Sequence, residues 1–326
     1  ARSTPGFIVN RIARPYYAET LALLLEQVAS PQVIDACLRG VGFRMGPCEL
    51  MDLIGHDTNF AVTRSVYEAN FYDKRYMPSL VQRELVDGGL LGRKSGRGFY
   101  RYPDGAPALP AATHPAPTLP ERLVVTGRGP LADLLHARAR DAAGTTPIGR
   151  DTSAPEAGLR VGDAVLVMTD GRSATELAAA TGVRDVAVFD RIVVAEPAPG
   201  MALAWSVAAG AHEDWAAQAA AWLAAMGFAP QQLPDTPALV VARTVAMLVN
   251  EAADAVLQGV CEPDEADAAM KLGVNYPAGP FEWLAGWSAA GVIGVLEALD
   301  REHRGERYRV SPWLRRARAR DAAAQG

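Results

Sequence analysis

The sequence contains an internal repeat that occupies both of its ends. Residues 4–28 (TPGFIVNRIARPYYAETLALLLEQV) recur 232 residues later as residues 236–260 (TPALVVARTVAMLVNEAADAVLQGV). The residues shared by the two copies include Thr4/Thr236, Pro5/Pro237, Val9/Val241, Arg11/Arg243, Glu19/Glu251, Leu25/Leu257 and Val28/Val260. A repeat at a fixed offset indicates a duplicated structural unit, and it constrains the fold more than any single motif does.

Each copy predicts a long buried helix. Threonine followed by proline is typical of a helix start, with Thr4 and Thr236 as N-caps and proline at the first helical position. Apolar residues then occur on most sides of residues 8–28, as expected for a helix inside a helical domain. The stretch is long enough to span a bilayer, but polar residues interrupt it and exclude a membrane span, namely Asn10, Arg11, Arg14, Glu19 and Glu26.

The repeat continues beyond this helix. Residues 31–39 match residues 263–271 as a second helix that begins with proline. Residues 40–55 then match residues 273–287 around a shared Gly-Pro-x-Glu motif. The copies differ there by one inserted residue, which a connecting turn tolerates.

These motifs together resemble one enzyme family. TPGFIVNR, the run GPCELMDLIG at residues 46–55 and GRKSGRGFYRY at residues 92–102 resemble the helical C-terminal domain of NAD-dependent 3-hydroxyacyl-CoA dehydrogenases. NEAADAVLQGV and GVNYPAGP resemble the second such domain of the long, two-copy bacterial members, including those of phenylacetate degradation. The resemblance implies an oxidoreductase of fatty acid β-oxidation or phenylacetate degradation that converts 3-hydroxyacyl-CoA to 3-oxoacyl-CoA.

The resemblance also implies that the sequence is a C-terminal portion. In the family the Thr-Pro motif follows a complete N-terminal NAD-binding domain, whereas only Ala1, Arg2 and Ser3 precede it here. NAD is therefore expected to bind that missing domain and not this chain, with acyl-CoA as the substrate of the full-length enzyme. Because helical domains of this family pair across a two-fold axis, the two copies are expected to form an intramolecular pseudo-dimer, with a homo-oligomer as a further option.

The composition argues against several other classes of protein. A net charge of −5 without a basic stripe argues against nucleic-acid binding. The three scattered cysteines fit a reducing cytoplasm better than a disulfide framework. No CxxC or HExxH motif occurs, so no metal site is expected.

Between the copies the sequence pattern changes. Residues 104–120 are proline-rich and predict a linker, which separates a first helical domain at residues 1–103 from a middle domain at residues 121–234; the second helical domain covers residues 235–326. In the middle domain, predicted strands alternate with predicted helices, which indicates a parallel α/β sheet. The predicted strands are residues 123–127, 164–168, 186–190 and 191–196, and the predicted helices are residues 129–143, 173–180 and 214–226. The predicted fold class is thus two duplicated all-α domains of the 3-hydroxyacyl-CoA dehydrogenase C-terminal type flanking a degenerate Rossmann-like α/β domain.

The middle domain carries a weakened dinucleotide-binding pattern. Residues 127–132 read GxGxxA between a strand and a helix, and Asp151 follows about 20 residues later, where a ribose-binding acid would lie. However, Pro130 cannot donate an amide hydrogen to a pyrophosphate, and the second strand around residues 145–150 is short. We therefore expect a domain that keeps the fold without the ligand.

The catalytic pair of the family is also missing from the middle domain. Oxidation of a 3-hydroxyacyl thioester needs a base for the hydroxyl proton, and an imidazole oriented by a carboxylate suits this role. In the family this His–Glu pair flanks an Asn-Pro-x-Pro turn. The matching run at residues 191–207 contains no histidine and has Trp205 at the glutamate position, so we expect neither catalytic nor cofactor-binding residues there.

Asn10 is the one catalytic residue expected in this chain. In the family, the asparagine of GFIVNR holds the substrate beside the catalytic histidine. An amide in an otherwise apolar helix is costly unless it is hydrogen-bonded, so a cap or an inter-helix hydrogen bond is the structural alternative. The repeat offers an internal comparison, because the counterpart of Asn10 is Ala242. This difference favours a functional role in the first copy alone.

Polar residues that occur in both copies are interpreted as structural, in contrast to Asn10. Arg11/Arg243 and Glu19/Glu251 are predicted to be structural, with each glutamate paired to an arginine inside the fold. The segment at residues 88–96 is interpreted as a tight glycine-rich turn that packs the aromatic residues after it, and not as a phosphate loop. His56 and His303 are expected to be isolated.

Two functional classes remain open at this point. The chain is either part of a dehydrogenase, inactive on its own and contributing Asn10 and the substrate-side wall, or a non-catalytic packing or dimerisation module. The helical substrate domain of a 6-phosphogluconate or hydroxyacid dehydrogenase is a weaker alternative, because the GPxELMD run argues against it.

Overall fold

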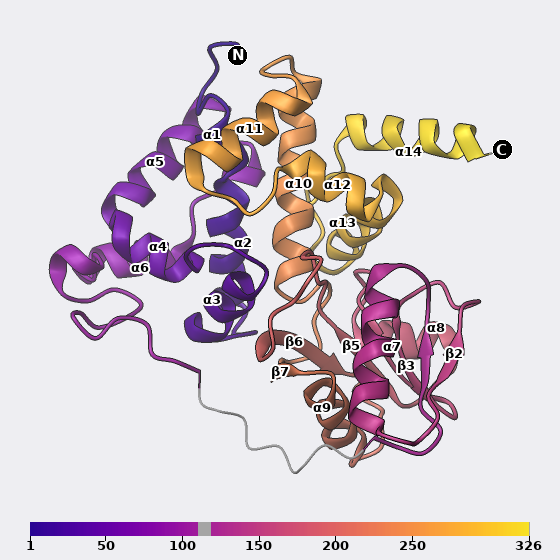
Figure 1. The fold of residues 1–326 in the computed structure, drawn as a ribbon. Helices are drawn as coiled ribbons and strands as arrows, with labels where there is room; N and C mark the ends of the chain where they lie inside the picture. The colour runs from indigo at the N-terminus through magenta and orange to yellow at the C-terminus, as the bar shows by residue number, and fades with distance from the viewer. Residues whose placement is uncertain (110–118, 326) are drawn as a thin grey trace. The chain divides into compact units, whose positions relative to one another are not determined.

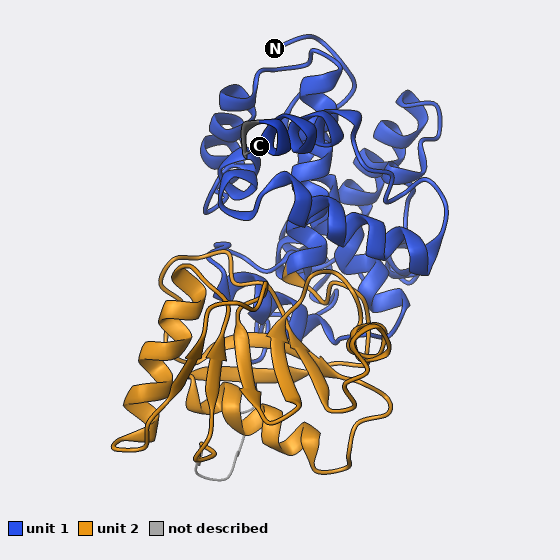
Figure 2. Cartoon of the chain, turned by 90° about the vertical axis from the view of Figure 1, so that its right-hand side faces the viewer, with its two compact units in different colours: residues 1–109, 242–326 blue, residues 110–241 orange. Residues whose placement is uncertain are grey.

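A computed structural model describes residues 1–109 and 119–325. The chain folds into two compact units, which Figure 2 colours separately. Residues 1–109 and 242–326 form a helical unit, and residues 110–241 form a sheet unit. Of the predicted linker at residues 104–120, residues 110–118 lie outside the described residues.

Both ends of the chain contribute helices to the helical unit (Figure 1). The first copy contains α1 (Val9–Ile12), α2 (Arg14–Leu25), α3 (Pro31–Gly40), α4 (Pro47–Ile54), α5 (His56–Ala69), α6 (Leu80–Asp87) and two short 3-10 turns, η1 (Lys74–Tyr76) and η2 (Arg93–Ser95). The second copy contains α10 (Val241–Leu257), α11 (Pro263–Val274), α12 (Pro280–Trp287), α13 (Ala289–His303) and α14 (Pro312–Gln325).

The long helices do not begin at the predicted caps, Thr4 and Thr236. A left-handed turn comes first in each copy, with φ of 81° and 47° at Gly6–Phe7 and of 61° and 50° at Ala238–Leu239. This backbone conformation is incompatible with a right-handed helix, so α1 and α10 begin only after the turn. Pro15 then divides the first helix into α1 and α2, because proline has no N–H to continue the hydrogen-bond ladder, whereas α10 runs without a break.

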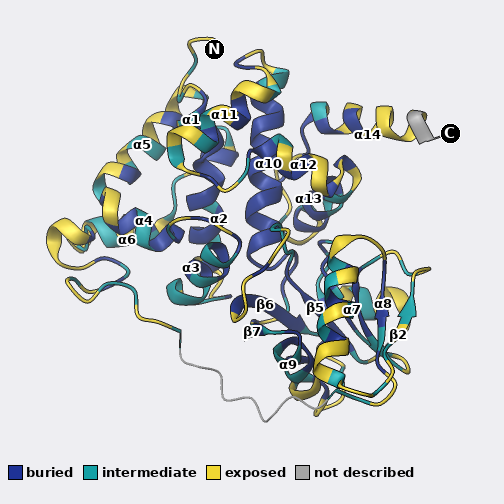
Figure 3. Cartoon of the chain, viewed as in Figure 1, coloured by how far each residue is buried: buried dark blue, intermediate teal, exposed yellow. Residues whose placement is uncertain are grey.

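The two copies share one hydrophobic core. Tyr16 stacks on Phe43 with ring centroids 4.7 Å apart, and Phe43 contacts Tyr276 and Trp283 of the second copy at 5.0 Å and 5.7 Å. The dark blue of α10 in Figure 3 marks how completely this helix is buried. The prediction of two separate all-α domains is therefore wrong, because neither apolar helix is covered by its own copy alone and both ends of the chain enter a single unit.

The sheet unit contains seven strands in the order β2-β1-β3-β4-β5-β6-β7. The strands are β1 (Val124–Thr126), β2 (Gly149–Asp151), β3 (Gly158–Val161), β4 (Ala164–Met168), β5 (Val186–Phe189), β6 (Met201–Val207) and β7 (Phe228–Gln232). The helices between them are α7 (Pro130–Ala143), α8 (Ala174–Thr181) and α9 (Trp215–Ala225).

The sheet is mixed, so the predicted parallel sheet is also wrong. β3 runs antiparallel to both β1 and β4, and β6 runs antiparallel to β5. The reason is local: β3 and β4 form a hairpin across a two-residue turn in which Gly162 has a φ of 56°. The predicted strand at residues 191–196 is not a strand, and the chain forms β6 later instead.

No helix in the described part of the chain is long and apolar enough to cross a membrane.

Candidate functional site

Asn10 lies on α1 with its side chain exposed. Among the described residues its amide has no hydrogen-bond partner, so the expected burial cost of this amide does not arise. Its counterpart, Ala242, is 0% exposed inside α10. The two copies thus present an open amide in one case and a packed methyl group in the other.

The retained charged residues form buried ion pairs between the copies. Arg11 Nε lies 2.7 Å from Glu251 Oε1, and Arg243 Nε lies 2.8 Å from Glu19 Oε2, with each arginine bound to the glutamate of the other copy. The prediction that each glutamate pairs with an arginine inside the fold is confirmed. The pattern is reciprocal, because each pair is the image of the other under the 232-residue offset.

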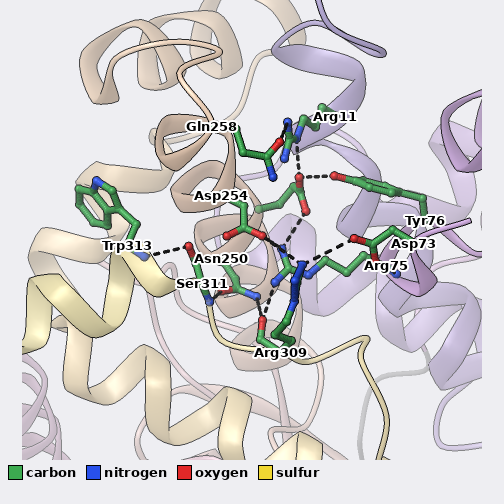
Figure 4. A network of polar contacts seen from close by, with 11 residues as sticks. Arg11, Asp73, Arg75, Tyr76, Asn250, Asp254, Gln258, Arg309, Ser311 and Trp313 are labelled. Atoms are coloured by element: carbon green, nitrogen blue, oxygen red, sulfur yellow. Dashed lines mark hydrogen bonds and ion pairs between the residues drawn. The ribbon is translucent and has the colours of Figure 1, made fainter. Parts of the chain in front are cut away.

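A second arginine joins each pair, together with a tyrosine. Arg75 Nη1 lies 3.4 Å from Glu251, whose other oxygen accepts from the Tyr76 hydroxyl at 2.5 Å. At the equivalent positions, Arg307 Nη2 and the Tyr308 hydroxyl donate to Glu19 at 2.9 Å and 3.0 Å. Figure 4 shows the first of these networks. The sequence analysis missed them, although an Arg-Tyr dipeptide recurs at the same offset.

The charges in these networks hold one another in the ionised state. Burial alone would raise the pKa of the Glu19 carboxyl, but Arg307 and Arg243 outweigh burial and bring this pKa below its ordinary value. Burial likewise opposes the charge on Arg11, but Glu251 keeps the pKa of Arg11 above its ordinary value. The networks are therefore built as ion pairs and not as neutral hydrogen bonds.

In each copy the Gly-Pro-x-Glu motif begins a helix that is capped by an aspartate from the preceding helix. The carboxylate of Asp35 accepts hydrogen bonds from Cys48 N at 2.8 Å and Glu49 N at 3.0 Å, and so caps α4. Asp267 caps α12 in the same way in the second copy. A Cβ on Gly46 would lie 2.2 Å from the Asp35 carboxyl carbon, so only glycine allows the carboxylate to reach the helix end.

The Asp35 carboxyl is expected to titrate near pH 6. Burial raises the pKa of its carboxyl to about 6. The pKa of Asp35 is higher in the folded than in the unfolded protein. Its contribution to the free energy of unfolding is therefore fully present below the unfolded pKa and is lost as the pH rises through 6. Over this window the free energy of unfolding changes by at most about 3 kcal/mol. Carbon-detected NMR of the aspartate carboxyls should show this midpoint, and Asp35→Asn should flatten the pH dependence of stability between pH 4 and 7. A midpoint near 4 would contradict the prediction.

The glycine-rich segment before residue 97 is a structural turn, as predicted. Asp52 accepts hydrogen bonds from Phe99 N and Tyr100 N, both at 3.0 Å, which holds the aromatic residues against the helical unit. The same carboxylate lies 2.8 Å from His56 Nε2, and both side chains are fully buried. His56 is therefore not isolated, contrary to expectation. His303 also approaches a carboxylate, with Nδ1 3.9 Å from Glu26 Oε1.

In the sheet unit, protein backbone closes the glycine-rich turn after β1. β3 lies between β1 and β4, and the chain leading into it passes so close that a Cβ on Gly127 would lie 2.7 Å from backbone atoms of Ala157. The following helix begins with Pro130, which has no amide hydrogen to offer. The Asp151 carboxylate is already engaged by Ser153 at 2.6 Å and by Arg160 at 3.3 Å.

The segment at residues 191–207 offers no catalytic pair. Trp205, at the expected glutamate position, is 1% exposed within β6. One histidine–carboxylate pair does occur in the unit, with His212 Nδ1 2.9 Å from Asp185 Oδ2. Asp185 immediately precedes β5, so this exposed pair lies at the amino end of that strand. Ligands of open α/β sheets bind at the carboxyl ends.

Comparison with known proteins identifies relatives of both units. The family described as "3-hydroxyacyl-CoA dehydrogenase, C-terminal domain" matches residues 6–102 and 239–324, and "3-hydroxybutyryl-CoA dehydrogenase reduced Rossmann-fold domain" matches residues 166–237. The 3-hydroxyadipyl-CoA dehydrogenase of Escherichia coli (strain K12) is 41% identical over 318 residues, which cover 96% of this chain and 59% of that protein. The mitochondrial hydroxyacyl-coenzyme A dehydrogenase of Sus scrofa is 38% identical over 102 residues, covering 31% of this chain and 32% of that protein.

A solved structure extends the likeness to the whole fold. The 3-hydroxybutyryl-CoA dehydrogenase from Escherichia coli K12 matches with a TM-score of 0.82 at 37% identity, over 99% of this chain and 61% of that chain. This chain therefore spans about three fifths of the length of the two Escherichia coli proteins. The first family description alone covers more than half of the sequence. The chain belongs to the 3-hydroxyacyl-CoA dehydrogenase family.

Proposed function

We propose that this chain forms the helical, substrate-side part of an NAD-dependent 3-hydroxyacyl-CoA dehydrogenase, which oxidises 3-hydroxyacyl-CoA to 3-oxoacyl-CoA. Asn10 supplies a contact to the acyl-CoA substrate. The observation that carries this proposal is the exposed amide of Asn10, which has no partner among the described residues, at a position where the second copy has a buried alanine. Such an amide can both donate to and accept from a ligand without breaking an internal hydrogen bond.

The second copy acts as a structural partner for the first. The reciprocal Arg11–Glu251 and Arg243–Glu19 pairs support an intramolecular pseudo-dimer, in which one chain supplies both halves of an interface that other proteins build from two subunits. We retain residues 1–103 and 235–326 as the two copies and residues 121–234 as the middle domain between them. Activity in the cytoplasm, in β-oxidation or phenylacetate degradation, belongs to the same proposal.

NAD does not fit the residues of the sheet unit. A pyrophosphate needs free backbone amides at the glycine-rich turn, but Ala157 closes on Gly127 and Pro130 lacks its amide hydrogen. Asp151, the residue at the ribose position, is occupied by Ser153 and Arg160. We therefore assign NAD binding to a domain other than the one described by residues 121–234.

These 326 residues alone are accordingly expected not to oxidise 3-hydroxyacyl-CoA. Without an imidazole–carboxylate pair beside the substrate no group takes the hydroxyl proton, and loss of such a base typically costs about 10²–10⁴-fold in rate. Calorimetry with NADH should show no binding tighter than about 100 μM, a typical enzyme affinity. Measurable NADH formation from 3-hydroxybutyryl-CoA by the purified chain would contradict both parts of this expectation.

A non-catalytic packing module is the second candidate function. The complete burial of Ala242 and the buried ion pairs favour it, because they describe packing and not chemistry. The two candidates are separated by joining the chain to an NAD-binding domain of the same family and measuring NAD reduction. Only the dehydrogenase proposal expects that activity to depend on Asn10.

A further inference from the structure

The helical unit contains a cavity beside α2 of the first copy, and the second copy shows which side chains fill the equivalent positions. Its volume is about 350 Å³, and its lining residues come from α2, the segment around η1 and residues 303–308. Ala18 and Ala22 of α2 are among these lining residues. Their counterparts at the 232-residue offset are Asn250 and Asp254 of α10.

In the second copy these two polar side chains occupy the equivalent space. Asn250 donates to Arg309 O at 3.0 Å and accepts from Ser311 N at 2.8 Å, while Asp254 forms an ion pair with Arg75 (Figure 4). The first copy has alanine at both positions, so its equivalents of these contacts are absent. The cavity thus lies where the second copy places an amide and a carboxylate.

The cavity is lined by a buried cation, Arg14, for which no anionic partner occurs in the described part of the chain. Arg14 is 6% exposed, and its Nε has no hydrogen-bond partner among the described residues. Its only polar side-chain contact in the described part of the chain is Thr63 Oγ1 at 3.3 Å, and its guanidinium lies 4.8 Å from the Tyr17 ring centroid. In the second copy the Arg14 position is Ala246 and, after the one-residue insertion, the Thr63 position is Leu296. Both are 0% exposed, so the cation belongs to the cavity and not to the shared fold.

Other lining residues define the remaining chemistry. His303 Nε2 also lacks a partner among the described residues, and Arg307 lines the cavity beside it. The nearby Glu26 carboxylate is already bound by two nitrogens of Arg243, at 2.9 Å and 3.0 Å, and Glu306 is exposed to solvent. Leu25, Met77 and Leu80 add exposed apolar surface to the lining.

We propose that this cavity binds a carboxylate carried by a short aliphatic chain. The carboxylate pairs with Arg14, while the chain lies against the apolar residues and extends into the room that Asn250 and Asp254 fill in the second copy. A planar guanidinium matches a carboxylate with paired hydrogen bonds, and a cavity of this size is typical of small-molecule sites. The carboxylate comes either from a free fatty acid or from the far end of a dicarboxylic acyl chain.

Calorimetry with hexanoate tests the proposal on the chain itself and does not depend on dehydrogenase activity. Hexanoate should bind, and 1-hexanol, which has the same chain without the charge, should bind at least about tenfold more weakly, because a charge-assisted hydrogen bond is lost. Arg14→Ala, which copies Ala246, and Ala22→Asp, which copies Asp254, should each weaken hexanoate binding by at least about tenfold.

Lys74→Ala serves as the matched control, because Lys74 also lines the cavity but is exposed. If this variant weakens hexanoate binding as much as Arg14→Ala does, the carboxylate is attracted by the overall positive charge and not by Arg14, and the proposal is wrong. Equal binding of hexanoate and 1-hexanol would also overturn the proposal. So would a lack of hexanoate binding at 10 mM, a concentration about tenfold above a weak, millimolar dissociation constant.

Competition distinguishes the two sources of the carboxylate. Displacement of hexanoate by adipyl-CoA but not by hexanoyl-CoA supports the far end of a dicarboxylic acyl chain, and displacement by neither supports a free fatty acid. Displacement by hexanoyl-CoA, which has no free carboxylate, would overturn carboxylate recognition.

Discussion

Glu19→Gln is expected to destabilise the helical unit by about 3–5 kcal/mol, the usual cost of breaking a buried ion pair by removing one partner. Glu19 is fully buried and accepts hydrogen bonds from Arg243, Arg307 and Tyr308. Glutamine keeps the size of the side chain, so the loss reflects the charge and not a cavity. Arg243 would keep its ion pair with Glu26, whereas the ion pair of Arg307 with Glu19 would be lost.

Urea unfolding followed by circular dichroism, with hydrogen exchange of the α2 and α10 amides, measures this loss. Glu68→Gln is the matched control, since Glu68 pairs with Arg64 at 3.5 Å on the surface, where an ion pair is worth about 0–1 kcal/mol. The pKa of Glu19 is lowered in the folded state, so its stabilisation is present above the unfolded pKa and is lost as the pH falls through the folded value. Equal effects of the two substitutions would show that the buried network contributes no more than a surface pair.

The duplication made part of this network predictable from the sequence. Arg11/Arg243 and Glu19/Glu251 lie within apolar helices, and a charge kept twice in such a helix requires a partner. The sequence could not say that the partners come from opposite copies. That exchange depends on two helices meeting in one core, which follows from the three-dimensional packing of both ends of the chain.

The helix starts could not be predicted from local residue preferences. Ala238 and Leu239 adopt positive φ values that such residues rarely adopt, and Thr236 before them imitates an N-cap. In the structure, the Asp190 carboxylate accepts from the amides of Val240 at 2.9 Å and Val241 at 2.6 Å instead. A cap supplied by a residue fifty positions away leaves no signal in the local sequence.

One feature of the sequence does indicate the antiparallel part of the mixed sheet. Residues 158–161 alternate apolar and polar side chains, residues 164–168 are apolar, and Gly162-Asp163 lies between them. Two such residues between strands indicate a hairpin. This hairpin inserts β3 beside β1 and brings Ala157 onto Gly127. The GxGxxA pattern remains in the sequence, but this tertiary contact removes the space that the pattern normally leaves for a phosphate.

The cavity also could not be predicted from the sequence. The difference between Ala18/Ala22 and Asn250/Asp254 is visible in the aligned copies, but alanine in a helix is ordinary by itself. Its meaning depends on knowing that Asn250 and Asp254 reach the Arg309–Ser311 segment and Arg75. A duplicated fold therefore provides its own reference structure, since one copy shows what fills the space that the other leaves open.

Asn10→Ala is expected to lower kcat/KM of the complete dehydrogenase by about tenfold or more, equivalent to at least about 1.4 kcal/mol of transition-state binding. The physical reason is the loss of one amide hydrogen bond to the acyl-CoA substrate. The thermal midpoint should stay unchanged, because the Asn10 side chain is exposed and has no partner among the described residues. Steady-state kinetics with 3-hydroxybutyryl-CoA, on this chain joined to an NAD-binding domain of the family, measures the effect.

Ala242→Asn is the informative counterpart, because it restores the asparagine at the equivalent position of the second copy. Ala242 is fully buried, so this variant should lose stability through an amide forced into the core, while its remaining folded fraction keeps a normal KM. Asn10→Ala should show the reverse, with a stable protein and impaired turnover. If Asn10→Ala turns over normally, or unfolds as Ala242→Asn does, then Asn10 has a structural role and the substrate contact lies elsewhere in the helical unit.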